Sequence, residues 1–236
     1  GVHTATTGTW TVDRNFTPSG GTLTMTGATV TFDGTSISDN STLSCAQTIA
    51  GTVDIAKTST GTFALGSGCT ITLGSLTDTK GDTTISGTLY NSNLATFRRS
   101  FDASLGTISN SGTLIFSGSS VSDSGILSCP SGSIGNVTLN KTTSNTLILG
   151  TNCTVGNFTR TDGAFSNPSS AYTLTVQGNF SMSTTDAFGG ANLILAMGGS
   201  VSTQTITQNA GTINNNIQIN KSSGTASLST NLTTNG

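Results

Sequence analysis

Hydrophobic and polar residues alternate in short runs along most of the chain. Apolar side chains occupy every second position in Val53-Asp54-Ile55, Ile71-Thr72-Leu73 and Val137-Thr138-Leu139. Because successive side chains on a strand point to opposite faces, each run predicts a short strand with one apolar edge. Gly, Asn, Asp and Ser between the runs predict tight turns. The pattern therefore indicates an all-β chain, and its regularity argues against disorder.

A block of sequence recurs, which makes the chain a repeat protein. Phe32 precedes Cys45 by 13 residues, and Phe116 precedes Cys129 by the same 13. Lys57, Lys141 and Lys221 align at offsets of 84 and 80 residues. A unit of this length divides naturally into three or four coils of short strands.

These features predict one fold: a parallel β-helix (β-solenoid) of about ten coils, each about 20–25 residues long. Coils stacked in parallel at about 4.8 Å would share one apolar interior that no single coil could bury alone. We expect a single domain over residues 1–236, made of three degenerate repeats at approximately 10–69, 70–153 and 154–232.

Composition and charge limit the kinds of partner that the chain can bind. Charged residues make up 8% of the chain and the net charge is −2, without a basic stripe, which argues against nucleic-acid binding. No apolar run reaches the length of a membrane span. We therefore expect neither a nucleic-acid partner nor a membrane span.

The four cysteines form two pairs of identical spacing, because Cys45 to Cys69 and Cys129 to Cys153 are each 24 residues. Residues one coil apart lie within the distance that a disulfide tolerates. We expect the disulfides Cys45–Cys69 and Cys129–Cys153, each joining one coil to the next, in an oxidising compartment. Buried free thiols and zinc are the alternatives, although the short CxxC pairs typical of zinc sites are absent.

The aligned lysines Lys57, Lys141 and Lys221 each follow a strand and precede a Ser/Thr turn. We interpret them as structural: positive tips at a corner of the rod that discourage lateral aggregation. An isopeptide bond to Asn or Asp is an alternative, but the sequence singles out no partner.

The segment Arg98-Arg99-Ser100-Phe101-Asp102 interrupts the repeat. We expect Arg98, Arg99, Phe101 and Asp102 to form a loop that protrudes from the rod and contacts a ligand. His3 is the only histidine, so no Ser-His-Asp or Cys-His set can be assembled. We expect no catalytic residue, no cofactor and no metal.

Two weaker alternatives depend on other residues. A polysaccharide lyase would use charged residues, and the candidates are Asp13/Arg14, Asp78/Lys80/Asp82, Arg98/Arg99/Asp102 and Arg160/Asp162. An ice-binding solenoid would need threonines repeated at one position per coil. The Thr-x-Thr pairs show no clear coil spacing, and they occur at Thr22/Thr24/Thr26, Thr29/Thr31, Thr58/Thr60 and Thr203/Thr205.

Residues 31–35, 137–144, 149–159 and 217–232 resemble the repeats of bacterial extracellular β-solenoids, the adhesin-like and filamentous haemagglutinin-like surface proteins. The resemblance implies a secreted or cell-surface protein with a structural or adhesive role. The chain begins and ends at nearly the same phase of the repeat, so we expect either an excerpt of a longer array or subunits that associate head to tail. The main functional expectation is a rod or filament subunit of a prokaryotic surface or matrix. An adhesin or carbohydrate-binding surface is the alternative.

Overall fold

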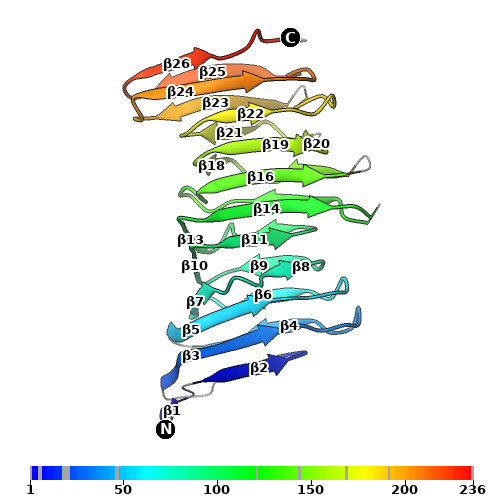
Figure 1. Cartoon of the computed structure of the whole chain (residues 1–236), viewed down its shortest axis with the longest axis vertical. Coiled ribbons are helices and arrows are strands. Elements are labelled where there is room, and N and C mark those ends of the chain that lie inside the picture. Colours follow the sequence, from blue (N-terminus) through cyan, green and yellow to red (C-terminus); the bar gives the residue numbers. More distant parts are fainter. Residues whose placement is uncertain are drawn as a thin grey trace.

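The computed structural model describes residues 2–4, 7–17, 22–45, 48–120, 122–142, 145–167, 170–190 and 192–234. These residues form an all-β parallel solenoid of about ten coils, as the sequence predicts. The coils stack along one axis, and the two termini lie at opposite ends of the stack (Figure 1). The approximate boundaries of the three repeats within it stay a prediction.

Four parallel sheets line the solenoid. The N-terminal sheet contains β1 (Val2–Thr4), β2 (Gly8–Val12), β3 (Thr22–Phe32), β5 (Thr48–Ile55), β7 (Thr70–Leu73), β10 (Thr88–Asn91) and β13 (Thr107–Asn110). The C-terminal sheet contains β18 (Cys153–Val155), β21 (Tyr172–Val176), β23 (Leu193–Gly199) and β25 (Asn216–Lys221).

The other two sheets form the remaining sides. The eight-stranded sheet contains β8 (Asp78–Thr79), β11 (Leu94–Phe97), β14 (Thr113–Gly118), β16 (Asn136–Lys141), β19 (Phe158–Asp162), β22 (Phe180–Met182), β24 (Thr203–Gln208) and β26 (Thr225–Leu228). The third sheet contains β4 (Ser41–Leu43), β6 (Phe63–Leu65), β9 (Thr83–Ile85), β12 (Phe101–Asp102), β15 (Gly125–Ser128), β17 (Thr146–Leu149) and β20 (Ala164–Ser166). A coil in the middle of the rod thus contributes one short strand to each of three sides.

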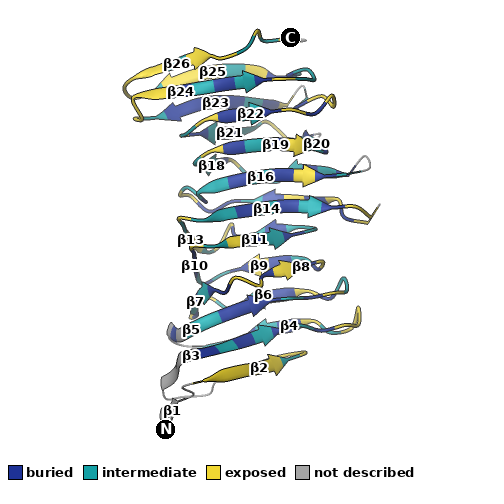
Figure 2. Ribbon diagram, viewed as in Figure 1, coloured by how far each residue is buried: buried dark blue, intermediate teal, exposed yellow. Residues whose placement is uncertain are grey.

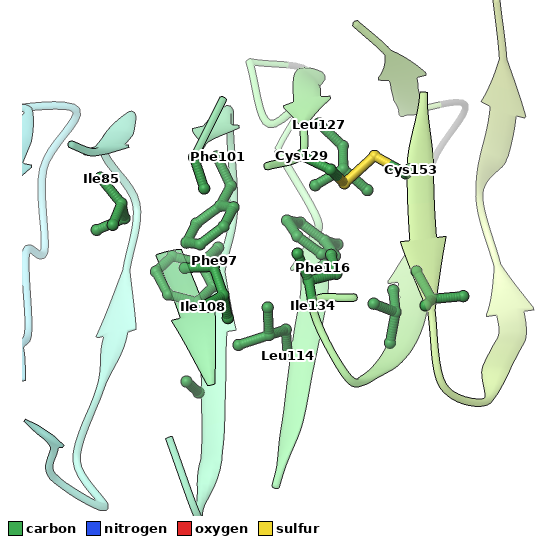
Figure 3. Close-up of a cluster of buried hydrophobic side chains, with 14 of the residues drawn as sticks. Ile85, Phe97, Phe101, Ile108, Leu114, Phe116, Leu127, Cys129, Ile134 and Cys153 are labelled. Carbon is green, nitrogen blue, oxygen red and sulfur yellow. A yellow bond between two sulfur atoms is a disulfide. The ribbon is translucent and has the colours of Figure 1, made fainter. Parts of the chain in front are cut away.

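The alternating residues point into a single core that runs through the coils. In β14 the burial alternates strictly, with Leu114 and Phe116 fully buried and Ile115 partly exposed. Aromatic rings from neighbouring coils meet inside, as Phe97, Phe101 and Phe116 do in Figure 3. The pairing register between coils places each apolar residue above another apolar residue. The alternation along one strand therefore also indicates which residues of the neighbouring strands face the interior.

Asparagines on the outer surface connect successive coils. The Oδ1 atom of Asn136 accepts the backbone N–H of Asn157 at 3.0 Å, and Oδ1 of Asn157 accepts that of Asn179 at 2.7 Å. Asn179 continues the series by accepting the N–H of Thr205 at 2.9 Å. These side chains satisfy backbone donors between the strands, where the ladder itself does not reach.

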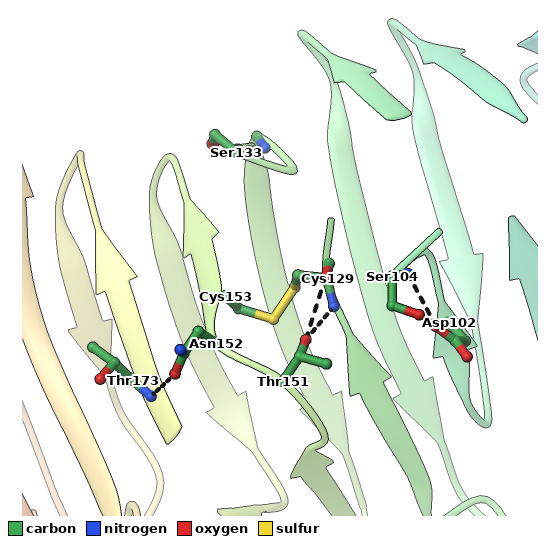
Figure 4. Close-up of a disulfide and its surroundings, with 9 residues drawn as sticks. Asp102, Ser104, Cys129, Ser133, Thr151, Asn152, Cys153 and Thr173 are labelled. Carbon is green, nitrogen blue, oxygen red and sulfur yellow. Dashed lines mark hydrogen bonds between the residues drawn. A yellow bond between two sulfur atoms is a disulfide. The ribbon is translucent and has the colours of Figure 1, made fainter. Parts of the chain in front are cut away.

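The two disulfides predicted from the spacing are confirmed. Cys45 and Cys69 are bonded with a Cα–Cα distance of 5.0 Å, and Cys129 and Cys153 are bonded at 5.2 Å. Each bond joins one coil to the next, and Figure 4 shows the second bond beside Thr151, whose hydroxyl meets the Cys129 backbone. The described residues include no free cysteine.

Replacing Cys129 and Cys153 together by alanine is expected to lower the free energy of unfolding by about 3 kcal/mol, because the bond closes a loop of the denatured chain. Urea unfolding followed by circular dichroism measures the loss. The double replacement of Cys45 and Cys69 is the matched control, since its loop has the same length and should give a similar loss. An unchanged unfolding midpoint for both variants would contradict the expectation.

Candidate functional site

The chemistry of this solenoid concentrates at what we call the loop edge: the turns that lead into the strands of the third sheet. Lys57, in the turn after β5, points inward there and is 1% exposed. Its Nζ donates to the carbonyl oxygens of Asp13 and Asp39 and to Oγ of Ser41, at 3.1, 2.5 and 2.6 Å. Burial lowers the pKa of Lys57, against the attraction of Asp39, Asp33 and Asp13.

Lys141 repeats this arrangement four coils further along. Its side chain is fully buried, and its Nζ donates to the carbonyl oxygens of Arg98, Ser117 and Asp123 at 2.6, 3.1 and 2.5 Å. Desolvation lowers the pKa of this ammonium to about 8, with Asp123 acting in the opposite direction. All three donors of each ammonium are used, so each lysine binds the backbone of neighbouring coils together.

The expectation of solvated positive tips is therefore wrong for Lys57 and Lys141. They act as internal clamps because the corner turns leave carbonyl groups that no strand satisfies. Lys221 differs again: it lies between the C-terminal and eight-stranded sheets, at another corner. Its Nζ donates to the Val201 carbonyl at 3.0 Å and to Oε1 of Gln204 at 2.9 Å. The alignment of this third lysine in sequence does not carry over to the structure.

Each buried lysine holds a loop that the hydrophobic pattern of the sequence does not predict. Residues 34–39 read Gly-Thr-Ser-Ile-Ser-Asp and residues 118–123 read Gly-Ser-Ser-Val-Ser-Asp. Asp39 Oδ2 accepts the Ser36 N–H at 2.7 Å, and Asp123 Oδ2 accepts the Ser120 N–H at 2.9 Å. The hydrogen bond from Ser36 lowers the pKa of Asp39. The repeated motif, at the same 84-residue offset as the lysines, is the signal that could have revealed these Ser-Asp loops.

The turns of the loop edge differ in length, and the short turns leave a recess between the long ones. The turns 56–62 and 119–124 are long, whereas the intervening turns 80–82 and 98–100 are short. Figure 1 shows the outline receding at β8 and β11 between the projecting loops near β6 and β14. The recess, which we call the notch, has a volume of about 280 Å³. The described residues that line it are Thr58, Ser59, Thr60, Lys80, Arg98, Ser119, Ser120, Ser122 and Asp123.

The floor of the notch carries the charged residues of two neighbouring coils. Arg98 forms a bidentate pair with Asp78, through Nε at 3.0 Å and Nη2 at 2.8 Å, and the pair raises the pKa of Arg98. Arg99 Nε lies 3.5 Å from Asp82 Oδ1 without a hydrogen bond. In the described part of the chain, the Lys80 side chain makes no hydrogen bond and no ion pair, so its charge is available to a ligand.

The contact segment predicted at residues 98–102 is only partly where the sequence placed it. It is a short turn in a recess, so the expectation of a protruding loop is wrong. Phe101 is fully buried against Phe97, at a centroid distance of 4.7 Å. Asp102 caps the next turn, because its Oδ1 accepts hydrogen bonds from the backbone N–H and the hydroxyl of Ser104 (Figure 4). Phe101 occupies an inward position of its strand and so belongs to the core. Arg98 and Arg99 are the two residues of the predicted contact segment that a ligand can reach.

The candidate lyase groups do not assemble as the sequence grouped them. Arg160 is fully buried, where its Nε donates to the Gly163 carbonyl at 2.6 Å, and burial lowers its pKa to about 10. A substrate cannot reach it beside Asp162. Asp13 and Arg14 lie near the first coils, with Arg14 paired to Asp39 at 3.6 Å. The structure instead pairs Asp78 with Arg98 and Asp82 with Arg99, across coils.

Threonines do recur at coil spacing, contrary to the sequence-based expectation. Successive coils of the N-terminal sheet pair Thr9 with Thr29, Thr29 with Thr52, and Thr52 with Thr72. The hydroxyls of Thr29 and Thr52 are 2.8 Å apart. Tyr90 occupies this position in the following coil and is 46% exposed. The column is therefore regular over four coils and then interrupted.

Other kinds of site are not evident in the described residues. They contain no group of three or more His, Cys, Asp or Glu side chains placed to hold a metal ion. They also contain no helix long and apolar enough to cross a membrane. No family model, no curated protein and no solved structure matches the chain. The fold therefore defines the class, a disulfide-linked parallel β-solenoid, and the function must be argued from the geometry.

Proposed function

We propose that this protein is an extracellular structural element, a rod that associates head to tail with further copies of itself. The observation that carries this proposal is the continuous apolar interior, in which every coil between the first and the last described ones is covered on both sides by parallel neighbours. The first and last described coils carry inward-facing apolar side chains that need the same cover, whether from another copy or from more of the same chain.

The last described coil presents such an end. Ile219 of β25 and Leu228 of β26 occupy inward positions of the strand pattern, yet each is 56% exposed. At the opposite end, Trp10 of β2 is 39% exposed. Figure 2 shows this change: β2 and β26 are coloured almost entirely as exposed, whereas strands in the middle of the stack, such as β14 and β16, include buried positions. Open parallel edges with apolar residues favour the addition of further strands.

A second copy of the chain is the occupant that we propose for these ends, because coils of this chain already bury the equivalent positions inside the rod. Met197 and Ile206, the coil partners of Ile219 and Leu228, are 0% and 2% exposed. The sequence likeness of Trp10–Val12 to Cys153–Val155 does not carry over to the structure, because the two segments lie in different sheets. Stacking would bury Ile219 and Leu228 in the same way that the register buries their equivalents.

An extracellular location is supported by covalent and surface chemistry. Two disulfides persist in oxidising compartments and reinforce a fold that must hold outside the cell. Only eight Lys and Arg residues are present, and Lys57, Lys141 and Arg160 are buried, so few sites are open to trypsin-like proteases. A polar Thr/Ser surface keeps such a rod soluble without much charge.

Head-to-tail association is tested by electron microscopy and by sedimentation over a range of concentrations. We expect fibres of uniform width whose length grows with concentration. Replacing Leu228 by lysine is expected to shorten or abolish them, because stacking would then bury an unpaired charge. The matched control is Ile126→Lys on the lateral surface, where Ile126 is 46% exposed, which should leave the fibres intact. Monomeric rods at every concentration would overturn the association.

The notch at the loop edge favours a second role, a carbohydrate-binding surface on the same rod. Its charged floor is the observation that distinguishes it from the Thr/Ser surface elsewhere. A polysaccharide lyase would use the same recess, and its product would reveal it, since lyases leave an unsaturated sugar that absorbs ultraviolet light.

A further inference from the structure

We propose that the notch between turns 56–62 and 119–124 binds a carboxylate-bearing saccharide, a segment of an acidic polysaccharide, through Lys80 and the outer edge of Arg98. The proposal rests on the second role given above, a carbohydrate-binding surface, and names its ligand class; it is independent of head-to-tail association. It rests on the shape of the recess, on the chemistry of its lining and on the rigidity of its floor.

The lining favours a strongly hydrophilic ligand. Besides Lys80, Arg98 and Asp123, the notch is lined by hydroxyl-bearing residues, with three from each projecting loop. Among the described residues no apolar side chain lines it, so a lipid or an apolar peptide would bury its surface against polar groups. A saccharide matches such walls because its ring hydroxyls both donate and accept hydrogen bonds.

The floor supplies the charge that selects a carboxylate. Arg98 has five N–H donors and uses two of them on Asp78, which leaves three on its outer edge. The planar guanidinium presents such donors in the geometry of a carboxylate. Lys80 adds a second cation from the neighbouring coil, one without a partner among the described residues. The Asp123 carboxylate is occupied by the N–H groups of Ser119 and Ser120, at 3.0 and 2.9 Å, which restrains it.

The notch is held in shape before any ligand arrives. Lys141 Nζ binds the Arg98 carbonyl from below and the Asp123 carbonyl in the upper loop, so one ammonium fixes both floor and wall. The Lys57 carbonyl accepts the Lys80 N–H at 2.9 Å, which fixes the other floor turn. Gly81 lets this turn approach turn 56–62 closely, because a Cβ there would collide with the Gly61 carbonyl. A rigid site loses little conformational entropy on binding.

A second hollow extends the site along the rod. It has a volume of about 200 Å³, shares Arg98 and Ser119 with the notch, and is also lined by Ser117, Gly118, Asn140 and Thr142. Because Arg98 and Ser119 line both hollows, the hollows are adjacent and can receive successive residues of a chain. This geometry favours an oligosaccharide over a single sugar acid.

Isothermal titration calorimetry of the intact, disulfide-bonded protein tests the proposal, with oligogalacturonate as the probe and a neutral galacto-oligosaccharide of equal length for comparison. We expect saturable binding of the acidic oligomer, weakened at high salt, and little binding of the neutral one. Lys80→Gln is expected to weaken binding about tenfold, the loss of one charge-assisted contact. Arg98→Gln should weaken it further.

Arg14→Gln is the matched control, since Arg14 is a surface cation outside the notch with a 69% exposed side chain. It should leave the affinity unchanged. Circular dichroism and non-reducing mass spectrometry establish that each variant keeps the fold and both disulfides. The proposal is overturned if the acidic oligomer does not bind, if the neutral oligomer binds equally well, or if Arg14→Gln weakens binding as much as Lys80→Gln does.

Discussion

Replacing Phe158 by alanine is expected to lower the free energy of unfolding by about 4 kcal/mol, the largest effect of any single substitution considered for this protein. Phe158 is fully buried at the centre of four phenyl rings. Its ring stacks on Phe180 at 5.8 Å and meets Phe165 and Phe188 edge-on at 5.3 and 5.8 Å. Phe158 and Phe165 belong to one coil and Phe180 and Phe188 to the next, so the cavity would interrupt the core where these two coils pack together.

Urea unfolding monitored by circular dichroism and by hydrogen exchange measures this loss. Exchange adds spatial information, because stability in a solenoid is shared mainly between neighbouring coils. We expect protection to fall most in β16, β19 and β22. Leu105→Ala is the control, since Leu105 is 82% exposed and its truncation should change the free energy by less than about 0.5 kcal/mol. A loss below about 1 kcal/mol for the Phe158 variant would contradict the packing argument.

Replacing Lys141 by methionine is expected to cost about 3 kcal/mol, although the new side chain is similar in length and apolar. The cost arises because the carbonyl oxygens of Arg98, Ser117 and Asp123 would lose their common donor inside the protein. Calorimetric or urea unfolding at pH 7 measures it. The same substitution at Lys221, whose side chain lies nearer the surface, is the comparison and should cost clearly less. Equal losses at both positions would contradict the clamp.

The buried ammonium of Lys141 also predicts that the free energy of unfolding depends on pH. The folded pKa of Lys141 is about 8, whereas the unfolded lysine keeps its proton up to about 10.5. Between these values the unfolded chain binds more protons, so the Lys141 contribution to the free energy of unfolding rises with pH through this window. The gain is about 1.4 kcal/mol for each unit of pKa difference. The free energy of unfolding of the wild-type protein should therefore rise relative to that of the methionine variant between pH 8 and 10.5. If the two proteins gave parallel profiles of this free energy against pH, the titration of Lys141 would not contribute.

The buried lysines Lys57 and Lys141 also hold the notch in place. The residues that form the notch floor, Lys80 and Arg98, are held through their backbones by Lys57 and Lys141. Changes at the clamps should therefore affect binding as well as stability, whereas Lys80→Gln should affect binding alone. This separation distinguishes a ligand contact from a structural contribution.

The sequence by itself determined the parallel solenoid, the number of coils and both disulfides. Strand alternation has a period of two, and stacking places equivalent positions above one another, so a repeat such as Phe32 to Cys45 and Phe116 to Cys129 already specifies which residues face inward. The cysteine pairs follow from the same reasoning, because one coil of separation brings their backbones within bonding distance.

Only the tertiary structure decided the roles of the charged residues. Lys57 and Lys141 resemble surface lysines in sequence, but the corner turns enclose them against carbonyl groups of other coils. Phe101 belongs to the core although it stands in an irregular segment, and the threonine column becomes visible only once the register is known. The physical reason is that a strand period fixes which way a side chain points, whereas the partners at a corner depend on the lengths of turns in several coils at once.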